Sequence, residues 1–92
     1  MMALDIHHDR SLRRFETIVE GQRCILDYEL RAGVMIITHV VVPDAVSGRG
    51  IAAELTRTAL ETARAERLRV IPQCPYAEAY LEKHPSYRDL LA

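Results

Sequence analysis

The sequence predicts an α+β fold with the element order β-β-β-α-β-α. Three observations support it: runs of alternating or continuous apolar residues before residue 43, an apolar period of i, i+4 after residue 50, and glycine-containing turns between the runs. The first three strands should form an antiparallel meander. The third and fourth strands, which a helix joins, should be a parallel pair.

The first two strands are expected over residues 13–20 and 23–31. The first run alternates loosely and ends at Glu20-Gly21, where glycine can take the positive φ of a hairpin turn. The second run alternates more regularly until Ala32-Gly33 turns the chain again. Its core face should carry Cys24, Leu26, Tyr28 and Leu30.

The third strand is expected over residues 34–42, which are apolar on both faces and rich in β-branched residues. This pattern is typical of a central strand that is covered on both faces, and Pro43 ends it. The fourth strand, residues 69–74, contains Pro72, which lacks an N–H group for the ladder. We therefore place this strand at an edge or beside a gap between strands.

Two helices complete the fold. Residues Ile51, Leu55, Ala59 and Ala63 recur at i+4, which predicts an amphipathic helix of about four turns. The second helix should run from residue 76 to about residue 83, where His84-Pro85 ends it. The tail at 86–91 has apolar surface to bury and should fold back onto the domain.

Composition indicates one ordinary globular domain over residues 1–92, in which 49% of the residues are hydrophobic. The 12 basic and 13 acidic residues almost cancel and form no basic run, so nucleic acid is not an expected partner. The longest apolar run is too short to span a membrane. The first ten residues do not resemble a secretory signal, so we expect a cytoplasmic protein whose Cys24 and Cys74 are free thiols.

The chain shows no metal-ligand spacing, and no metal is expected. Three histidines are interpreted as surface residues: His7, His8 and His84.

The turn Ser47-Gly48-Arg49-Gly50 joins the third strand to the main helix. Its glycines let the backbone approach a ligand closely, while the first N–H groups of the helix have no intrahelical acceptor. The helix dipole and the Arg49 charge favour a phosphate or pyrophosphate there. The simpler interpretation is a helix N-terminus that Ser47 caps, with glycines that serve only the turn.

Two reactive side chains are expected near the same edge of the sheet. His39 lies near the end of the third strand and Cys74 ends the fourth, and ligands bind beyond the carboxyl ends of parallel strands. His39 precedes Val42 by three residues, or about 10 Å, so a ligand on the glycine turn can extend an arm to it. Either residue alone is also explained by core packing, as are Tyr76 and Tyr80.

Four segments, residues 39–43, 48–52, 72–76 and 84–90, together resemble the small single-domain GNAT-like N-acetyltransferase family from Arg14 onward. The resemblance implies that the third and fourth strands splay apart and that acetyl-CoA enters the wedge between them. It implies catalysis by His39 and Cys74. The residues implied in binding acetyl-CoA or CoA are Val40, Val41, Val42, Ser47, Gly48, Arg49, Gly50, Ile51, Ala52, Pro75, Tyr76 and Tyr80.

The sequence departs from the family pattern in two places. Ala45 stands where the broad signature has Gln or Arg, and residues 9–15 leave no room for the helices that shape the acceptor pocket of full-length members. The implied reaction transfers an acetyl group to an amine of unknown identity, either a small amine or a protein lysine or N-terminus. His39 would be the general base, and Cys74 would be either a proton donor or a nucleophile, with direct transfer preferred.

Other functions stay open at this stage. The chain could bind CoA or acetyl-CoA as a sensor or subunit with little turnover, as the short acceptor region suggests. A phosphate- or RNA-binding module and a thiol redox protein are less favoured, because the chain has one Phe, no Trp, and no second cysteine near Cys74 in sequence. The expected oligomeric state is a monomer or a homodimer.

Overall fold

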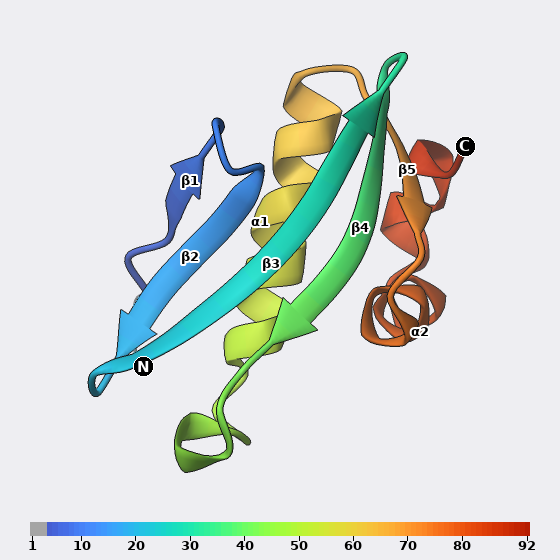
Figure 1. Cartoon of the computed structure of the whole chain (residues 1–92). Coiled ribbons are helices and arrows are strands. Elements are labelled where there is room, and N and C mark those ends of the chain that lie inside the picture. Colours follow the sequence, from blue (N-terminus) through green and yellow to red (C-terminus); the bar gives the residue numbers. More distant parts are fainter. Residues whose placement is uncertain (1–3) are drawn as a thin grey trace.

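A computed structural model describes residues 4–92. Its strands are β1 (His7–Asp9), β2 (Arg14–Val19), β3 (Gln22–Arg31), β4 (Val34–Val41) and β5 (Arg69–Pro72). Its α-helices are α1 (Ile51–Ala65) and α2 (Pro75–Lys83), and the 3₁₀ turns are η1 (Asp44–Val46) and η2 (Pro85–Leu90) (Figure 1). The predicted α+β class and element order are confirmed, with β1 as an additional strand.

The strands form a single sheet in the order β1-β2-β3-β4-β5. The pairs from β1 to β4 are antiparallel, and β4 and β5 are parallel. The predicted meander and parallel pair are thus confirmed. Both hairpin loops place their two central residues at positive φ, 50° and 77° at Glu20-Gly21 and 49° and 79° at Ala32-Gly33. Two-residue loops of this kind match the right-handed twist of the strands they join.

The core lies between one face of the sheet and the helices. α1 packs on β2 to β5, and α2 packs on β4, β5 and α1, so both helices cover the same face. Figure 1 shows α1 running behind the sheet along β3 and β4. The largest buried apolar side chains are Phe15, Leu26, Met35, Ile37, Ile51, Leu55 and Leu60.

The expectation that β4 is covered on both faces is wrong. On the face away from α1, Ile36 is half-buried, Val41 is 49% exposed, and Ile71 of the neighbouring strand is 42% exposed. Neither helix lies on that face, because α2 turns back beside α1. The apolar residues on this side of β4 therefore border an open sheet face.

The N-terminal strand changes the interpretation of one histidine. β1 pairs with β2 and places His8 opposite Phe15. The two rings stack with centroids 4.0 Å apart, and His8 Nε2 lies 2.7 Å from the Tyr28 hydroxyl. The expectation that His8 is a surface residue is therefore wrong, whereas His7 and His84 are exposed.

The tail folds back as expected. η2 buries Tyr87 and Leu90, and Leu91 forms an isolated parallel bridge to Val70 on the outer edge of β5. Leu91 itself stays 38% exposed. Both cysteines are free thiols, as expected. Among residues 4–92, no helix has the length and apolar character needed to cross a membrane.

Candidate functional site

The two parallel strands separate part-way along β4. Their pairing covers Val34–Ile37 against Arg69–Pro72, and the Cys74 N–H group then donates to the Ile37 carbonyl at 3.0 Å. Residues 38–41 of β4 continue beyond this pairing, while the other chain turns into α2. A gap, called the wedge below, therefore opens between the end of β4 and the start of α2.

The loop after β4 presents its backbone at the mouth of the wedge. Gly48 and Gly50 have φ values of 77° and 78°, and a Cβ atom at either position would meet no atom within 4 Å. Gly50 is the N-cap of α1 and no side chain caps the helix, so its first N–H groups lack a side-chain acceptor. The expectation that Ser47 caps the helix is wrong, because its hydroxyl donates to the Asp44 carbonyl at 3.0 Å.

A hollow of about 230 Å³, called the loop hollow below, lies beside these N–H groups. Seven of the residues expected to bind a cofactor line it together with Ala53. The seven are Val42, Ser47, Gly48, Gly50, Ile51, Ala52 and Tyr76. The structure thus brings together most of the residues expected to bind a cofactor, from the segment after β4, from α1 and from α2.

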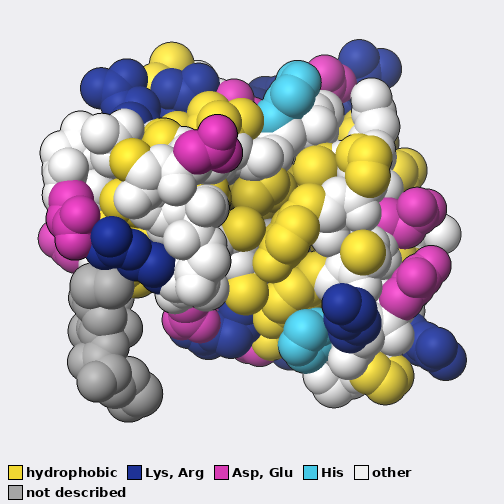
Figure 2. Space-filling model, turned by 90° about the horizontal axis from the view of Figure 1, so that it is seen from below, with side chains coloured by type: hydrophobic (Ala, Val, Ile, Leu, Met, Phe, Trp, Pro, Cys, Tyr) yellow, Lys and Arg dark blue, Asp and Glu magenta, His cyan; other side chains and the backbone are white. Residues whose placement is uncertain are grey.

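A second hollow of about 150 Å³, called the α2 hollow below, adjoins the first. Both hollows are lined by Ala53 of α1 and Tyr76 of α2. Viewed from below, hydrophobic side chains fill the middle of this end of the molecule (Figure 2). The remaining lining residues of the α2 hollow are Ala79, Tyr80, Lys83 and His84.

Some expected site residues do not line either hollow. Arg49 turns to the β2–β3 hairpin, where its guanidinium donates to Glu20 at 2.6 and 3.3 Å. Val40 packs against the core, and Val41 is exposed on the open face. Pro75 is the first residue of α2.

His39 lies on the open face of the sheet, opposite Asp27 of β3. Its Nδ1 atom is 3.1 Å from the Thr38 hydroxyl, which donates its proton to the Asp27 carbonyl at 3.2 Å. Because that proton is already used, the hydroxyl oxygen must accept from His39, so Nδ1 carries the proton. The neutral ring then has its lone pair on Nε2.

A register irregularity produces this arrangement. Asp27 pairs with His39 but Tyr28 pairs with Ile37, so Thr38 is an extra residue in β4. Such a bulge reverses the alternation of side chains that follow it. Met35 and Ile37 therefore face the core before the bulge, and Val40 faces the core after it. The ring of His39 is thereby placed on the open face.

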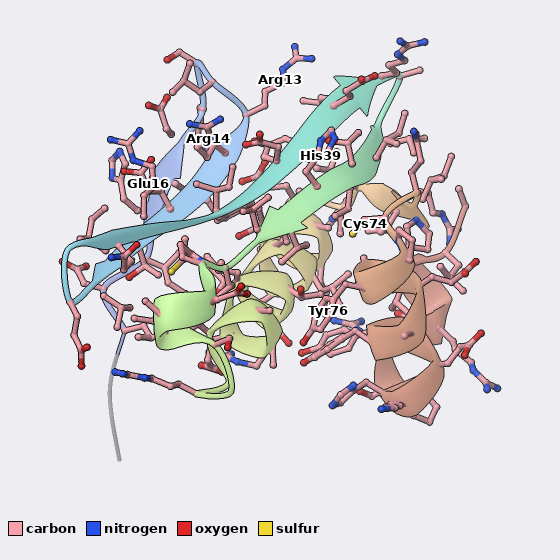
Figure 3. The ribbon with its side chains drawn as sticks, turned by 60° about the horizontal axis from the view of Figure 1, so that its bottom comes forward. Arg13, Arg14, Glu16, His39, Cys74 and Tyr76 are labelled. Atoms are coloured by element: carbon pink, nitrogen blue, oxygen red, sulfur yellow. The ribbon has the colours of Figure 1, made fainter. Side chains whose placement is uncertain are left out.

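Cys74 is the N-cap of α2 and is only 8% exposed. Figure 3 shows His39 on β4, Cys74 beside the gap between β4 and α2, and Tyr76 extending from α2 toward α1. No hydrogen bond joins His39 to Cys74 within the part of the chain that the structure describes. The two residues flank the wedge from different sides and do not form a dyad.

The rings along α2 are partly desolvated. Burial raises the pKa of the Tyr76 hydroxyl and that of Tyr80 above their usual value, so both are neutral donors near neutral pH. Residues 4–92 contain no group of three or more His, Cys, Asp or Glu side chains arranged to hold a metal ion.

Sequence reasoning missed five residues at this site: Thr38, Ala53, Ala79, Lys83 and His84. Ala53 of α1 and Ala79 of α2 line the same hollow, and no local sequence pattern indicates where two helices border a shared hollow. Thr38 contacts His39 only because the bulge places the two side chains together, and the sequence does not reveal the bulge. Lys83 and His84 follow Tyr76 and Tyr80 at helical spacing, and this spacing could have placed all four residues on one face of the second helix.

The model of a protein family described as GCN5-related N-acetyl-transferase matches residues 14–90. The chain belongs to this family. The chain is also similar to Protein NATD1 of Gallus gallus, which is 34% identical over 85 residues that cover 89% of this chain and 77% of that protein. The Homo sapiens Protein NATD1 is 35% identical over 83 residues, covering 87% of this chain and 74% of that protein.

Comparison with a solved structure also indicates this family. The NMR solution structure of a GCN5-like protein of Staphylococcus aureus aligns with a TM-score of 0.77 and 26% sequence identity. The alignment covers 100% of this chain and 91% of the other. The resemblance that the four sequence segments indicated is confirmed, and the chain is a GCN5-related N-acetyltransferase with a mixed α+β fold.

Proposed function

We propose that this protein transfers the acetyl group of acetyl-CoA to an amine, with the wedge as the site of transfer. The observation that carries the proposal is the loop hollow, which gathers seven of the expected cofactor-binding residues beyond the end of β4, at the mouth of the wedge that opens where β4 and β5 separate. His39 on β4 and Cys74 at the start of α2 flank the wedge.

The pyrophosphate of acetyl-CoA would bind at the start of α1. The N–H groups of residues 48–52 and the positive end of the helix dipole favour a negative charge, and the two glycines leave the space above the backbone open. Tyr76 lines the same hollow and can donate its hydroxyl proton to a phosphate oxygen, whereas the Ser47 hydroxyl already donates to the Asp44 carbonyl. These contacts would fix the cofactor without requiring the missing Gln or Arg at position 45.

The pantetheine arm would lie along the end of β4. Residues 40–42 continue past the last residue that pairs with β5, so an extended amide chain can bind there in the manner of an added strand. Following the strand from Val42 toward Ile37 leads into the wedge. The thioester would then lie between His39 and Cys74.

Direct transfer needs one proton acceptor and one proton donor. His39 Nε2 takes the proton of the attacking amine as the C–N bond forms, because Nδ1 is already protonated against Thr38. As the C–S bond breaks, the thiol of Cys74 gives its proton to the leaving sulfur. The two side chains return to their starting states by proton exchange with water.

The burial of Cys74 supports the donor role over the nucleophile role. Its side chain lies in the core cluster, and no cationic side chain bonds to it within the described residues. A thiolate nucleophile is normally activated by a nearby positive charge. The amine acceptor would approach from the open face, where His39 is exposed.

Isothermal titration with acetyl-CoA and CoA tests the proposal. We expect micromolar binding, about −8 kcal/mol, which a Gly48→Glu variant loses because its carboxylate occupies the phosphate position. Gly33→Glu is the matched control, since Gly33 also has a positive φ of 79° and open space at its Cβ, but lies in a hairpin far along β4. The control should bind like the wild type.

The outcomes separate the alternatives. Absence of binding to the wild-type protein would overturn the proposal. Binding together with acetylation of an amine, lost in His39→Ala while binding persists, would support transfer. Binding without acetylation across small amines and lysine peptides would favour a CoA sensor or subunit.

A further inference from the structure

His39 lies between two pairs of aliphatic side chains on the open face of the sheet. Ile25 of β3 lies opposite Val41 of β4, and Ile36 of β4 lies opposite Ile71 of β5. Val41 and Ile71 are exposed, and the other two are half-buried. Neither helix covers this face. The proposed base therefore has open apolar surface on both sides.

We propose that the acceptor is a lysine side chain in the middle of an extended polypeptide segment. The segment lies over β4 and carries one apolar residue two positions before the lysine and another two positions after it. The inference rests on the proposed function, because it takes His39 as the base of the transfer. It adds a substrate class and a sequence preference around the acetylated lysine.

The spacing on the sheet fits an extended chain. The two aliphatic pairs lie in the rows that include Ile25 and Glu29 of β3, and His39 lies in the row of Asp27 between them. Each pair is thus two residues, or about 7 Å, from the row of His39. Side chains two residues apart on an extended segment point to the same side and have the same spacing. A lysine over His39 therefore places its two apolar neighbours over the two pairs.

The two-sided arrangement distinguishes a lysine from other amines. An N-terminal amine at His39 would have its chain on one side only, so one aliphatic pair would stay uncovered. A small amine would cover neither pair, and His39 lines neither the loop hollow nor the α2 hollow. The flexible four-carbon stem of lysine also lets the amine pass His39 and reach the thioester in the wedge.

The charges on this face favour uncharged neighbours of the lysine. Each carboxylate that β2 and β3 place on the open face is paired with an arginine, so the surface around His39 has no excess charge for an acidic or basic segment. The pairs are Arg14 with Asp27, Arg23 with Glu16 and Arg31 with Glu29. Aliphatic surroundings also favour the neutral amine that attacks the thioester, because desolvation disfavours the ammonium.

The exposed aliphatic side chains have a simpler explanation, which the experiment must separate. Single apolar residues occur on the surfaces of proteins without binding anything. In that case their replacement would not change which peptide is acetylated. A docked segment would instead make each flanking preference depend on the aliphatic pair beneath it.

The test compares capped peptides that carry one central lysine, with acetyl-CoA as the donor. One peptide has valine two residues before and two residues after the lysine, one has serine at both positions, and two have valine on one side only. We expect kcat/KM for the two-valine peptide to exceed that for the two-serine peptide by about tenfold, a part of what burial of two valine side chains contributes. Titration of the peptides against the protein with CoA bound should give the same order of affinities.

Two substitutions identify the surface. Ile25→Thr and Ile71→Thr keep a β-branched side chain, so the sheet is retained. Each should abolish the preference for valine on one side of the lysine, on opposite sides for the two variants, while the affinity for CoA stays constant. Ile18→Thr is the matched control, because Ile18 is 54% exposed on the same face but lies on β2, two strands from β4. The control should keep both preferences.

The outcomes separate the inference from the proposed function. Equal acetylation and equal binding of the four peptides would overturn the inference, as would faster acetylation of a small amine or of a peptide N-terminus. Preferences that persist in both variants would overturn the place of the segment on this face. A preference in binding without any acetylation would support the docking surface and refute the transfer. Failure of the wild type to bind acetyl-CoA would refute the proposed function itself.

Discussion

The guanidinium of Arg49, in the loop between β4 and α1, donates hydrogen bonds from both of its terminal nitrogens to the carboxylate of Glu20 in the β2–β3 hairpin, at 2.6 and 3.3 Å. The pair holds the pKa of Glu20 below its usual value, mainly through the hydrogen bond itself. The charge that was expected to attract a pyrophosphate is therefore paired with a carboxylate of the protein.

Releasing Arg49 should strengthen binding of CoA. Glu20→Gln removes the competing charge, and we expect the dissociation constant for CoA to fall by a factor of about two to five at low salt, the effect of an exposed ion pair. Glu54→Gln is the control, because it releases Arg57 on α1 in the same way. The affinity for CoA would be measured by titration at two salt concentrations. Equal changes in Glu20→Gln and Glu54→Gln would contradict a specific role of Arg49.

The hydrogen bond from His39 to Thr38 should matter for turnover and not for cofactor binding. Thr38→Val keeps the shape of the side chain but removes the hydroxyl that accepts from His39. The neutral His39 ring can then carry its proton on either nitrogen, so a smaller fraction of it has the free Nε2 lone pair that the proposed base needs. We expect kcat to fall about tenfold, a modest part of what general bases contribute, while the affinity for CoA stays constant.

Steady-state kinetics over a range of pH would check this prediction. The control is Thr62→Val, which removes a hydroxyl that donates to the Thr58 carbonyl within α1. An unchanged kcat in Thr38→Val, or an equal loss in both variants, would show that Thr38 does not position the base.

The meander and the main helix were predictable because their signals are local. Positive φ at Gly21 and Gly33 follows from glycine at the hairpin turns, and the i+4 spacing of Ile51 and Leu55 defines the buried side of α1. The loop hollow was predictable for a similar reason. It is built mainly from one continuous segment that joins β4 to α1.

The errors arose where tertiary packing decides. β1 is only three residues long, and His8 is half-buried because β1 pairs with β2 beside Phe15. A continuous apolar run such as β4 indicates burial on both faces, but no helix lies on the second face in the described part of the chain. The bulge at Thr38 depends on the register with β3, which the sequence of one strand does not specify.

Stability should decrease as the pH falls below neutrality, in part through His8. Burial, followed by the nearby charge of Arg10, lowers the pKa of His8 from its ordinary value of 6.5 in the folded state. The unfolded chain therefore takes up a proton near pH 6.5 before the folded chain does, which favours unfolding. The contribution of His8 to the free energy of unfolding is fully present above that pH. It decreases as the pH falls further, down to the lower pKa that His8 has in the folded state.

Urea unfolding at pH 7.5 and pH 5.5 would measure this effect. His8→Gln retains a hydrogen-bonding group for Tyr28 but does not titrate, so the difference between the two pH values should shrink. His7→Gln, on the exposed side of the same strand, should leave it unchanged. Carboxylates with lowered pKa, such as Glu66 beside Arg10, lose their contribution only at lower pH. An undiminished pH dependence in His8→Gln would exclude this histidine as its source.

At alkaline pH, stability should decrease in part through Tyr87, whose hydroxyl attaches the tail to α1. Its hydroxyl donates to Glu61 Oε2 at 2.6 Å, and burial together with this bond raises its pKa from 10.0 to about 12. The unfolded chain loses the phenolic proton near pH 10 while the folded chain keeps it, so this contribution to stability decreases between about pH 10 and pH 12.

Tyr87→Phe should remove that alkaline loss and should cost about 1 kcal/mol of unfolding free energy at neutral pH, the usual net value of a hydrogen bond. Tyr76→Phe is the control, because its hydroxyl makes no hydrogen bond within residues 4–92 and its loss should leave the stability of the free protein nearly unchanged. Chemical unfolding at pH 7.5 and pH 10.5 separates the two variants. If Tyr87→Phe kept the stability at pH 7.5, the bond to Glu61 would not hold the tail, and the packing of Leu90 would be its main attachment.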